Sequence, residues 1–202
     1  MGATPLPAVV PSPNTIPPFT ASGVLPPYLG GDPAVAGVMS PYRVTLTELV
    51  QRFSYTPERR AILAGFLAHR ACLIGFGVTG IQWIDGSFLE DIENTAARAP
   101  GDIDVVNFIE RPPAYRGNHA AWGTFFQSRL DVFHPQTAKA AYRTDAYFVE
   151  VEFGPALVIQ QTAYWCGLFS HNRATGLWKG MLEILLDAHQ DDDAASQLLA
   201  TI

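Results

Sequence analysis

Two aspartates stand two residues apart in an apolar segment near the middle of the chain. They are Asp102 and Asp104, in the segment 102–109 (DIDVVNFI), which is predicted to form a strand. Side chains two residues apart on a strand share one face, so the two carboxylates would lie side by side and repel each other. The spacing therefore predicts either a solvated surface or a site for a divalent cation. Mg²⁺ suits such a site because it binds one or two carboxylates together with phosphate oxygens.

A glycine and a serine precede these aspartates. Gly86 and Ser87 follow the apolar segment 81–84, which is predicted as a buried strand, and fourteen residues lie between Ser87 and Asp102. Glycine lets a ligand approach the backbone closely. A serine hydroxyl at a helix start, beside free N–H groups, is typical of a phosphate site. The alternative is purely structural, because Ser87 and Glu90 have the spacing of a capping box.

The rest of the chain alternates between predicted helices and strands. Thr45 with Glu48 is a capping-box signature, and Thr56 before Pro57 is a second helix start. We expect helices over 45–53, from Thr56 to about Leu73, and over 120–128, 156–170 and 190–202, with strands over 81–84, 102–109, 147–153 and 181–186. This alternation predicts an α/β (or α+β) fold with a small mixed sheet and flanking helices.

Three glycines match a nucleotide-binding pattern by letter only. Gly75, Gly77 and Gly80 have the spacing G-x-G-x-x-G. A dinucleotide fingerprint follows a strand and opens a helix, whereas this one follows a predicted helix and precedes a predicted strand. We therefore expect a helix end and a turn here.

The N-terminal segment has a different composition from the rest. Ten of the 16 prolines lie in residues 1–41, and the first charged side chain is Asp32. Proline removes backbone donors and fixes φ, so residues 1–41 are predicted to be an extended or disordered arm, and residues 42–202 the folded domain. Such an uncharged arm could lie along the body or dock on a second copy or a partner protein.

Composition excludes several classes of function. The net charge of −6 disfavours a protein that coats nucleic acid or an anionic membrane. No apolar run is long enough to span a membrane and no signal peptide is apparent, so a soluble, cytoplasmic protein is expected. Cys72 and Cys166 are expected to be buried thiols rather than a disulfide, and the five histidines show no metal-ligand spacing.

The combination of turn and aspartates resembles a known signature. Gly86-Ser87 followed by Asp102-x-Asp104 is similar to the motif of the DNA polymerase β-like nucleotidyltransferase superfamily. Within it the chain resembles the DUF6932 proteins, with residues 1–24 outside the resemblance. The matching segments are 25–27 (LPP), 45–49 (TLTEL), 84–88 (IDGSF), 100–105 (PGDIDV), 138–148 (AKAAYRTDAYF) and 172–180 (NRATGLWKG).

The resemblance implies roles for these residues. Gly86 and Ser87 would hold the phosphates of a nucleoside triphosphate, and Asp102 and Asp104 would bind two Mg²⁺ ions. A third carboxylate on a later strand would complete the site. Asp145 is the first choice for it, because it follows the lysine–tyrosine segment as in the family pattern.

Other carboxylates remain alternatives to Asp145. Asp131 also lies among apolar residues, and Glu150 and Glu152 lie on the same predicted strand. Glu150 is an odd number of residues from Asp145, so it should point to the opposite face.

Two basic residues flank a predicted glycine turn near this site. Lys179 could neutralise triphosphate charge, with Arg173 beside it, although an exposed turn is the simpler interpretation. Trp165 or Trp178 could stack on a base, although core packing is again simpler.

The function implied is Mg²⁺-dependent transfer of a nucleotidyl group from a nucleoside triphosphate to RNA, a protein hydroxyl, a nucleotide or a small molecule. Small members of the superfamily often belong to toxin–antitoxin or phage-defence systems. The alternatives are a catalytically inactive module with the same fold that binds a nucleotide or a partner, and a structural protein with solvated aspartates.

Overall fold

A five-stranded mixed sheet forms the centre of the molecule. The computed structural model describes residues 16–32, 34–35, 37–187 and 191–202. Its strands lie in the order β1-β5-β2-β3-β4, with β2 antiparallel to both neighbours and the β1–β5 and β3–β4 pairs parallel. The bounds are β1 Tyr42–Arg43, β2 Thr79–Asp85, β3 Ile103–Glu110, β4 Thr144–Glu150 and β5 Leu182–Leu186. The predicted mixed α/β class is confirmed.

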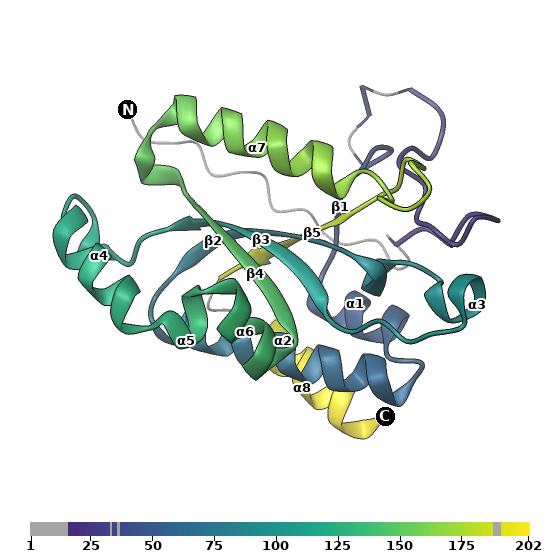
Figure 1. The fold of residues 1–202 in the computed structure, drawn as a ribbon, viewed down its shortest axis with the longest axis horizontal. Coiled ribbons are helices and arrows are strands. Elements are labelled where there is room, and N and C mark those ends of the chain that lie inside the picture. Colours follow the sequence, from purple (N-terminus) through teal and green to yellow (C-terminus); the bar gives the residue numbers. More distant parts are fainter. Residues whose placement is uncertain (1–15, 33, 36, 188–190) are drawn as a thin grey trace.

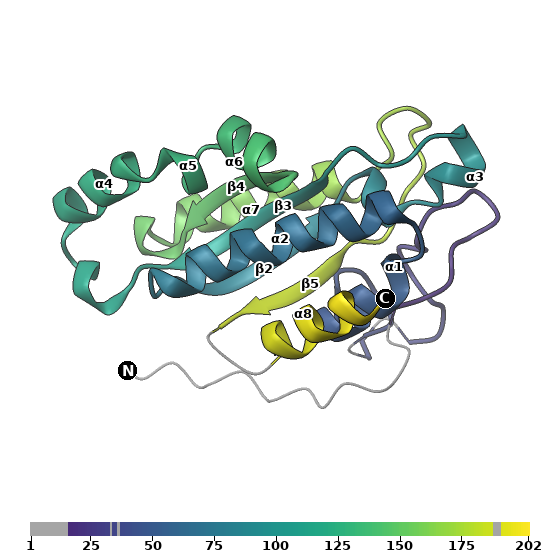
Figure 2. The same ribbon diagram turned by 90° about the horizontal axis from the view of Figure 1, so that it is seen from below.

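Helices cover both faces of this sheet (Figures 1 and 2). The α-helices are α1 Leu46–Phe53, α2 Pro57–Gly75, α3 Ile92–Ala96, α4 His119–Ser128, α5 Leu130–Phe133, α6 Pro135–Tyr142, α7 Pro155–Phe169 and α8 Asp191–Thr201. Three short 3₁₀ turns complete the set: η1 Ser87–Leu89, η2 Pro113–Tyr115 and η3 Val151–Phe153. In Figure 1, α7 lies above the sheet, and α1, α2, α5, α6 and α8 lie below it.

The side chains of β3 alternate between the two faces. Ile103 and Val105 belong to the core beneath the sheet, which includes α1 and α2. Val106 and Phe108 face the other way and pack with Trp165 of α7. Because Asp104 is two residues from Val106, this alternation directs it toward the α7 side.

The predicted helix starts are confirmed. The Thr45 hydroxyl accepts from the Glu48 N–H at 3.1 Å, and the Glu48 carboxylate accepts from the Thr45 N–H at 2.7 Å. Thr56 caps α2 with Pro57 in its first turn, and α2 ends at Gly75, where a turn leads into β2. The expected helix end at the glycine-rich segment is therefore correct.

The predicted strand over 147–153 is wrong at both ends. The strand β4 begins at Thr144 and ends at Glu150, and η3 follows it. Arg143 ends α6 with a φ of +52°, and Thr144 then pairs with Ile103 of β3. This pairing partner is distant in the sequence, so the alternation of residues along one segment does not reveal it.

Part of the proline-rich segment packs on the body. Ile16 and Leu25 are buried in the main core. The Gly180 N–H donates to the carbonyl of Leu25 at 2.7 Å, and the Tyr42 hydroxyl donates to that of Pro26 at 2.7 Å. Residues 1–15 of the predicted arm lie outside the described residues.

The cysteine prediction needs correction. Cys72 is half-buried, whereas Cys166 is exposed. Cys166 lies on α7, where only Trp165 and Phe169 are buried, so it is on the solvent side of that helix. None of the helices in the described ranges is both long and apolar enough to cross a membrane.

Candidate functional site

Three carboxylates lie in a row across three neighbouring strands. Asp85 ends β2 and pairs in register with Asp104 of β3, which pairs in register with Asp145 of β4. Directly paired residues point to the same face, so the three side chains lie side by side on the α7 side of the sheet. We call these three residues the carboxylate row. The sequence prediction included Asp104 and Asp145 and missed Asp85.

The predicted glycine turn contacts this row directly. Gly86 has a φ of +85° and a ψ of −173°, a conformation essentially restricted to glycine. A Cβ at this position would overlap the Oδ2 atom of Asp104. Glycine is therefore required both for the backbone conformation and for the close approach of the Asp104 carboxylate.

Lys179 fixes this turn from the other side. Its buried Nζ lies 2.9 Å from Oδ1 of Asp85 and 2.7 Å from Oε1 of Glu90, and it donates to the Gly86 carbonyl at 3.4 Å. Burial would lower the pKa of Lys179, but the two carboxylates raise it above its usual value. The ammonium group is thus charged and already engaged. The simpler interpretation of Lys179 as an exposed turn residue is therefore wrong, and its role toward a triphosphate stays a prediction.

The capping box between Ser87 and Glu90, which was the structural alternative for this segment, does not form. Residues 87–89 make a single 3₁₀ turn without a side-chain cap. The Glu90 carboxylate instead accepts from Lys179 and from Asn172, the latter at 3.0 Å. These two partners lie in the segment 171–180, so long-range contacts replace the local one that the spacing suggested.

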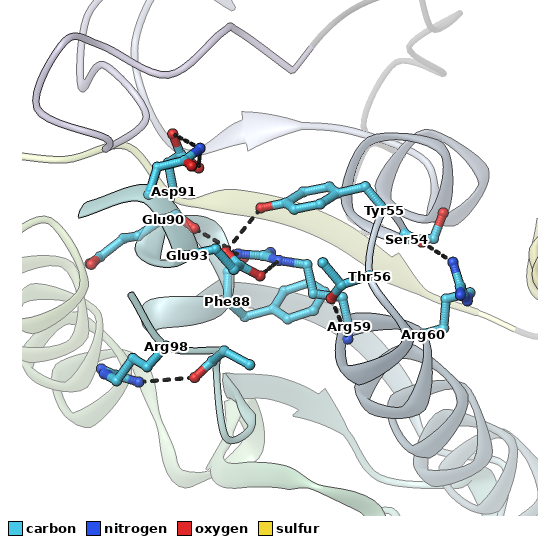
Figure 3. A network of polar contacts seen from close by, with 12 residues as sticks. Ser54, Tyr55, Thr56, Arg59, Arg60, Phe88, Glu90, Asp91, Glu93 and Arg98 are labelled. Carbon is cyan, nitrogen blue, oxygen red and sulfur yellow. Dashed lines mark hydrogen bonds and ion pairs between the residues drawn. The ribbon is translucent and has the colours of Figure 1, made fainter. Parts of the chain in front are cut away.

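A buried arginine of α2 holds the segment that follows the turn (Figure 3). Arg59 donates to the carbonyls of Phe88 at 2.6 Å and Glu90 at 2.7 Å. Its guanidinium also binds both oxygens of Glu93, at 2.6 and 2.9 Å. Tyr55 donates to the same carboxylate at 3.2 Å. This clamp connects α2 to the turn and was not predicted from the sequence.

A second lysine contacts the other end of the row. Lys139, in the last turn of α6, contacts Oδ2 of Asp102 and lies 3.3 Å from Oδ2 of Asp145. Asp102 immediately precedes β3, so this ammonium group joins the first predicted aspartate to the third.

The central carboxylate has no such partner. Among the described residues, none forms a hydrogen bond or an ion pair with Asp104. Burial, together with the negative charges of Asp102 and Asp145, raises its pKa to about 6. Burial likewise raises the pKa of Asp85 to about 7, against the opposing effect of Lys179.

The carboxylate row forms the floor of a cavity of about 460 Å³. Tyr147, Tyr164 and Trp165 contribute an aromatic wall, and Arg98 and Arg173 also line the cavity. A cavity of this size suits a small-molecule or nucleotide ligand. Trp165 is a buried member of the core cluster with Val106 and Phe108, as the simpler interpretation predicted, and it also lines this cavity.

Gly86, Ser87 and Lys179 also line this cavity. Trp178 is 66% exposed on the neighbouring turn.

The alternative carboxylates lie elsewhere. Asp131 is exposed on α5 and pairs with Arg129 at 2.9 Å. Glu150 pairs with Arg111 at 2.6 Å, and Glu152 accepts from the backbone N–H of Arg111 at 2.8 Å, both at the far end of β4. Asp145 alone of the four candidates lies beside Asp104.

The donor types fit a hard divalent cation, although the side chains do not converge on one. No group of three His, Cys, Asp or Glu side chains in the described ranges lies close enough together to hold a metal ion. Asp102, Asp104 and Asp145 nonetheless offer only carboxylate oxygens, which Mg²⁺ prefers. The half-buried Asp104 has no hydrogen-bond or ion-pair partner among the described residues. The residues fit the cation in kind, and the ammonium of Lys139 contacts two of them in this structure.

The chain was compared with known proteins. No curated protein and no solved structure matched it. A family model, described as a family of unknown function (DUF6932), matches residues 17–185. The match begins before residue 25, so the expectation that residues 17–24 lie outside the resemblance is wrong. These residues also contact the body: Phe19 packs on Phe53, and the buried Val24 pairs with Glu90. Because the match covers most of the chain, including the turn and the carboxylate row, the chain belongs to the DUF6932 family.

Proposed function

We propose that the chain is a Mg²⁺-dependent nucleotidyltransferase with a fold of the DNA polymerase β-like type. The observation that carries this proposal is the contact between the Gly86 turn and Asp104, within the carboxylate row. A phosphate-binding turn and acidic side chains must meet if a metal-bound triphosphate is to be held. Here they meet at the floor of a cavity large enough for a nucleotide.

The turn and the two arginines would bind the triphosphate. Gly86 has no side chain to block approach to its backbone, and the Ser87 hydroxyl lies at the same cavity. Arg98 and Arg173 line the cavity too, and guanidinium groups bind phosphate oxygens in a bidentate manner. In this assignment the arginines provide positive charge for the phosphates, while Lys179 keeps the turn in place through Asp85 and Glu90.

The carboxylates would hold the cations. Asp102 and Asp104 would bind both Mg²⁺ ions, with Asp145 joining them on the second. Bound Mg²⁺ neutralises phosphate charge and lowers the pKa of an attacking hydroxyl. The acceptor hydroxyl would attack the α-phosphorus, forming a phosphoester bond, and pyrophosphate would leave as the bond to the β-phosphate breaks.

The aromatic wall would receive the base. Tyr147, Tyr164 and Trp165 line the side of the cavity that α7 and β4 contribute. Flat aromatic side chains stack on every base, so this wall predicts little selectivity among bases.

The acceptor stays open between RNA, a protein hydroxyl, a nucleotide and a small molecule. The net charge of −6 gives slight weight against long nucleic acids. A toxin–antitoxin or phage-defence role is proposed on resemblance alone, and a cytoplasmic location is proposed from the sequence pattern.

One observation favours a second candidate function. Lys139 contacts two of the proposed metal ligands. If this contact persists, those carboxylates do not bind a metal ion, and the fold would bind a nucleotide or partner without turnover. A module of that kind would bind a nucleotide and transfer nothing.

Incubation with each α-labelled nucleoside triphosphate, Mg²⁺ and cell lysate tests the proposal. We expect label to move to an RNA, protein or small-molecule product, and Asp104→Asn to abolish this transfer. Asp131→Asn is the matched control, since it also removes one carboxylate charge but lies outside the site. Nucleotide binding without transfer would establish the second candidate instead.

A further inference from the structure

We infer that Lys139 is an internal counter-ion that a divalent cation must displace from Asp102 and Asp145. This inference rests on the proposed function, because it assigns those aspartates to the cation. It adds that the affinity of the site for the free cation is set by a lysine of the chain itself.

The geometry of Lys139 supports displacement. Its ammonium contacts both carboxylates, and therefore lies where a bridging cation would need to be. The Lys139 side chain is 51% exposed, whereas those of Asp102 and Asp145 are only 16% and 17% exposed. The lysine can swing into solvent without opening the core, while the carboxylates stay in place.

The two lysines of the site differ in this respect. The Lys179 side chain is 4% exposed and is fixed by Asp85 and Glu90. Lys139 is the removable one, held by two ion pairs at the surface. Departure of Lys139 would remove the ion-pair partner that Asp102 and Asp145 have among the described residues, and would leave Asp104 with only the electrostatic effect of Lys179. A divalent cation would restore the positive charge lost there.

A cation has to compete with the Lys139 ammonium, because both carboxylates are already in contact with it. A free cation would bind weakly for this reason, and phosphate oxygens of a nucleotide would supply the additional ligands that favour the exchange.

Titration of the full chain with Mn²⁺ alone, followed by electron paramagnetic resonance, tests this competition. Lys139→Met removes the charge at nearly constant length, and we expect it to bind Mn²⁺ about fivefold more tightly than the wild type, the effect of a partly exposed ion pair. Lys139→Arg should retain the wild-type affinity. Arg116→Gln controls for net charge, because its ion pair with Glu110 is exposed and remote, and should also leave the affinity unchanged.

The outcomes separate this inference from the proposed function. Equal or weaker Mn²⁺ binding by Lys139→Met, with binding still abolished by Asp104→Asn, would overturn the inference and leave the cation site standing. Absence of Mn²⁺ binding by both the wild type and Lys139→Met would overturn the cation site and the inference together. Tighter binding by Lys139→Met that Asp104→Asn abolishes would establish the competition.

Discussion

Neutralising the central carboxylate should stabilise the metal-free protein. Asp104 is half-buried and has no hydrogen-bond or ion-pair partner among the described residues, and it lies beside the charges of Asp102 and Asp145. The charge that would bind a cation therefore opposes folding when no cation is present. Asp104→Asn removes that charge while keeping nearly the same shape.

The magnitude follows from the pKa of Asp104. The rise of this pKa from 3.8 to about 6 means that the ionised carboxylate lowers the free energy of unfolding by about 3 kcal/mol at pH values above the folded-state pKa. Solvent reaching the partly buried carboxylate reduces this, so we expect a stabilisation of about 1–3 kcal/mol at pH 8. The pKa of Asp104 is higher in the folded than in the unfolded protein, so protonation of this carboxyl stabilises the wild type. This stabilisation is complete below pH 3.8 and is lost as the pH rises through about 6. At pH 4 the difference between variant and wild type should fall below about 1 kcal/mol.

Urea denaturation in EDTA at pH 8 and at pH 4 measures both values. Asp131→Asn is the control for loss of one negative charge. Its effect on stability should have the opposite sign, because the hydrogen bond from Arg129 lowers the pKa of Asp131. It should leave the stability at pH 8 unchanged or slightly lower. An Asp104→Asn protein that is less stable than the wild type at pH 8, or equally stabilised at both pH values, would refute the reasoning.

Three further substitutions test the surroundings of the site. Gly86→Ala should abolish Mn²⁺ binding, because the added methyl group overlaps the Asp104 carboxylate. Gly101→Ala is the control, since the space around Gly101 is open, and it should bind Mn²⁺ normally in the same titration. Arg59→Ala should cost about 3 kcal/mol, because Glu93 and two carbonyls lose a buried partner, and should lower the melting temperature by roughly 10 °C in calorimetry; an unchanged melting temperature would mean that the clamp contributes nothing. Arg173→Gln should weaken nucleotide binding several-fold without changing stability, and equal affinity by calorimetry would remove this arginine from the phosphate site.

Local signals in the sequence predicted much of the fold. The capping box at Thr45, the start of α2 at Thr56 and the turn after Gly75 depend on neighbours in the chain, and all three are confirmed. The side-by-side placement of Asp104 and Asp145 also agrees with the prediction, although their function stays a proposal.

Contacts between distant segments could not be predicted from local signals in the sequence. Asp85 joins the carboxylate row only because β2 pairs with β3, although its position directly before the glycine turn was a usable hint. Glu90 has capping-box spacing, yet its carboxylate binds Lys179, 89 residues away in the chain. The Arg59 clamp and the Lys139 contacts likewise depend on tertiary packing, which residue spacing does not report.

The most direct test of the central claim compares ATP labelled at the α-phosphate with ATP labelled at the γ-phosphate. Wild-type protein with Mg²⁺ and the lysate fraction that contains the acceptor should transfer the α-label only. The γ-label should be released in pyrophosphate. Asp104→Asn should transfer neither. Transfer of the γ-label, or equal α-label transfer by Asp104→Asn, would contradict nucleotidyl transfer at this site.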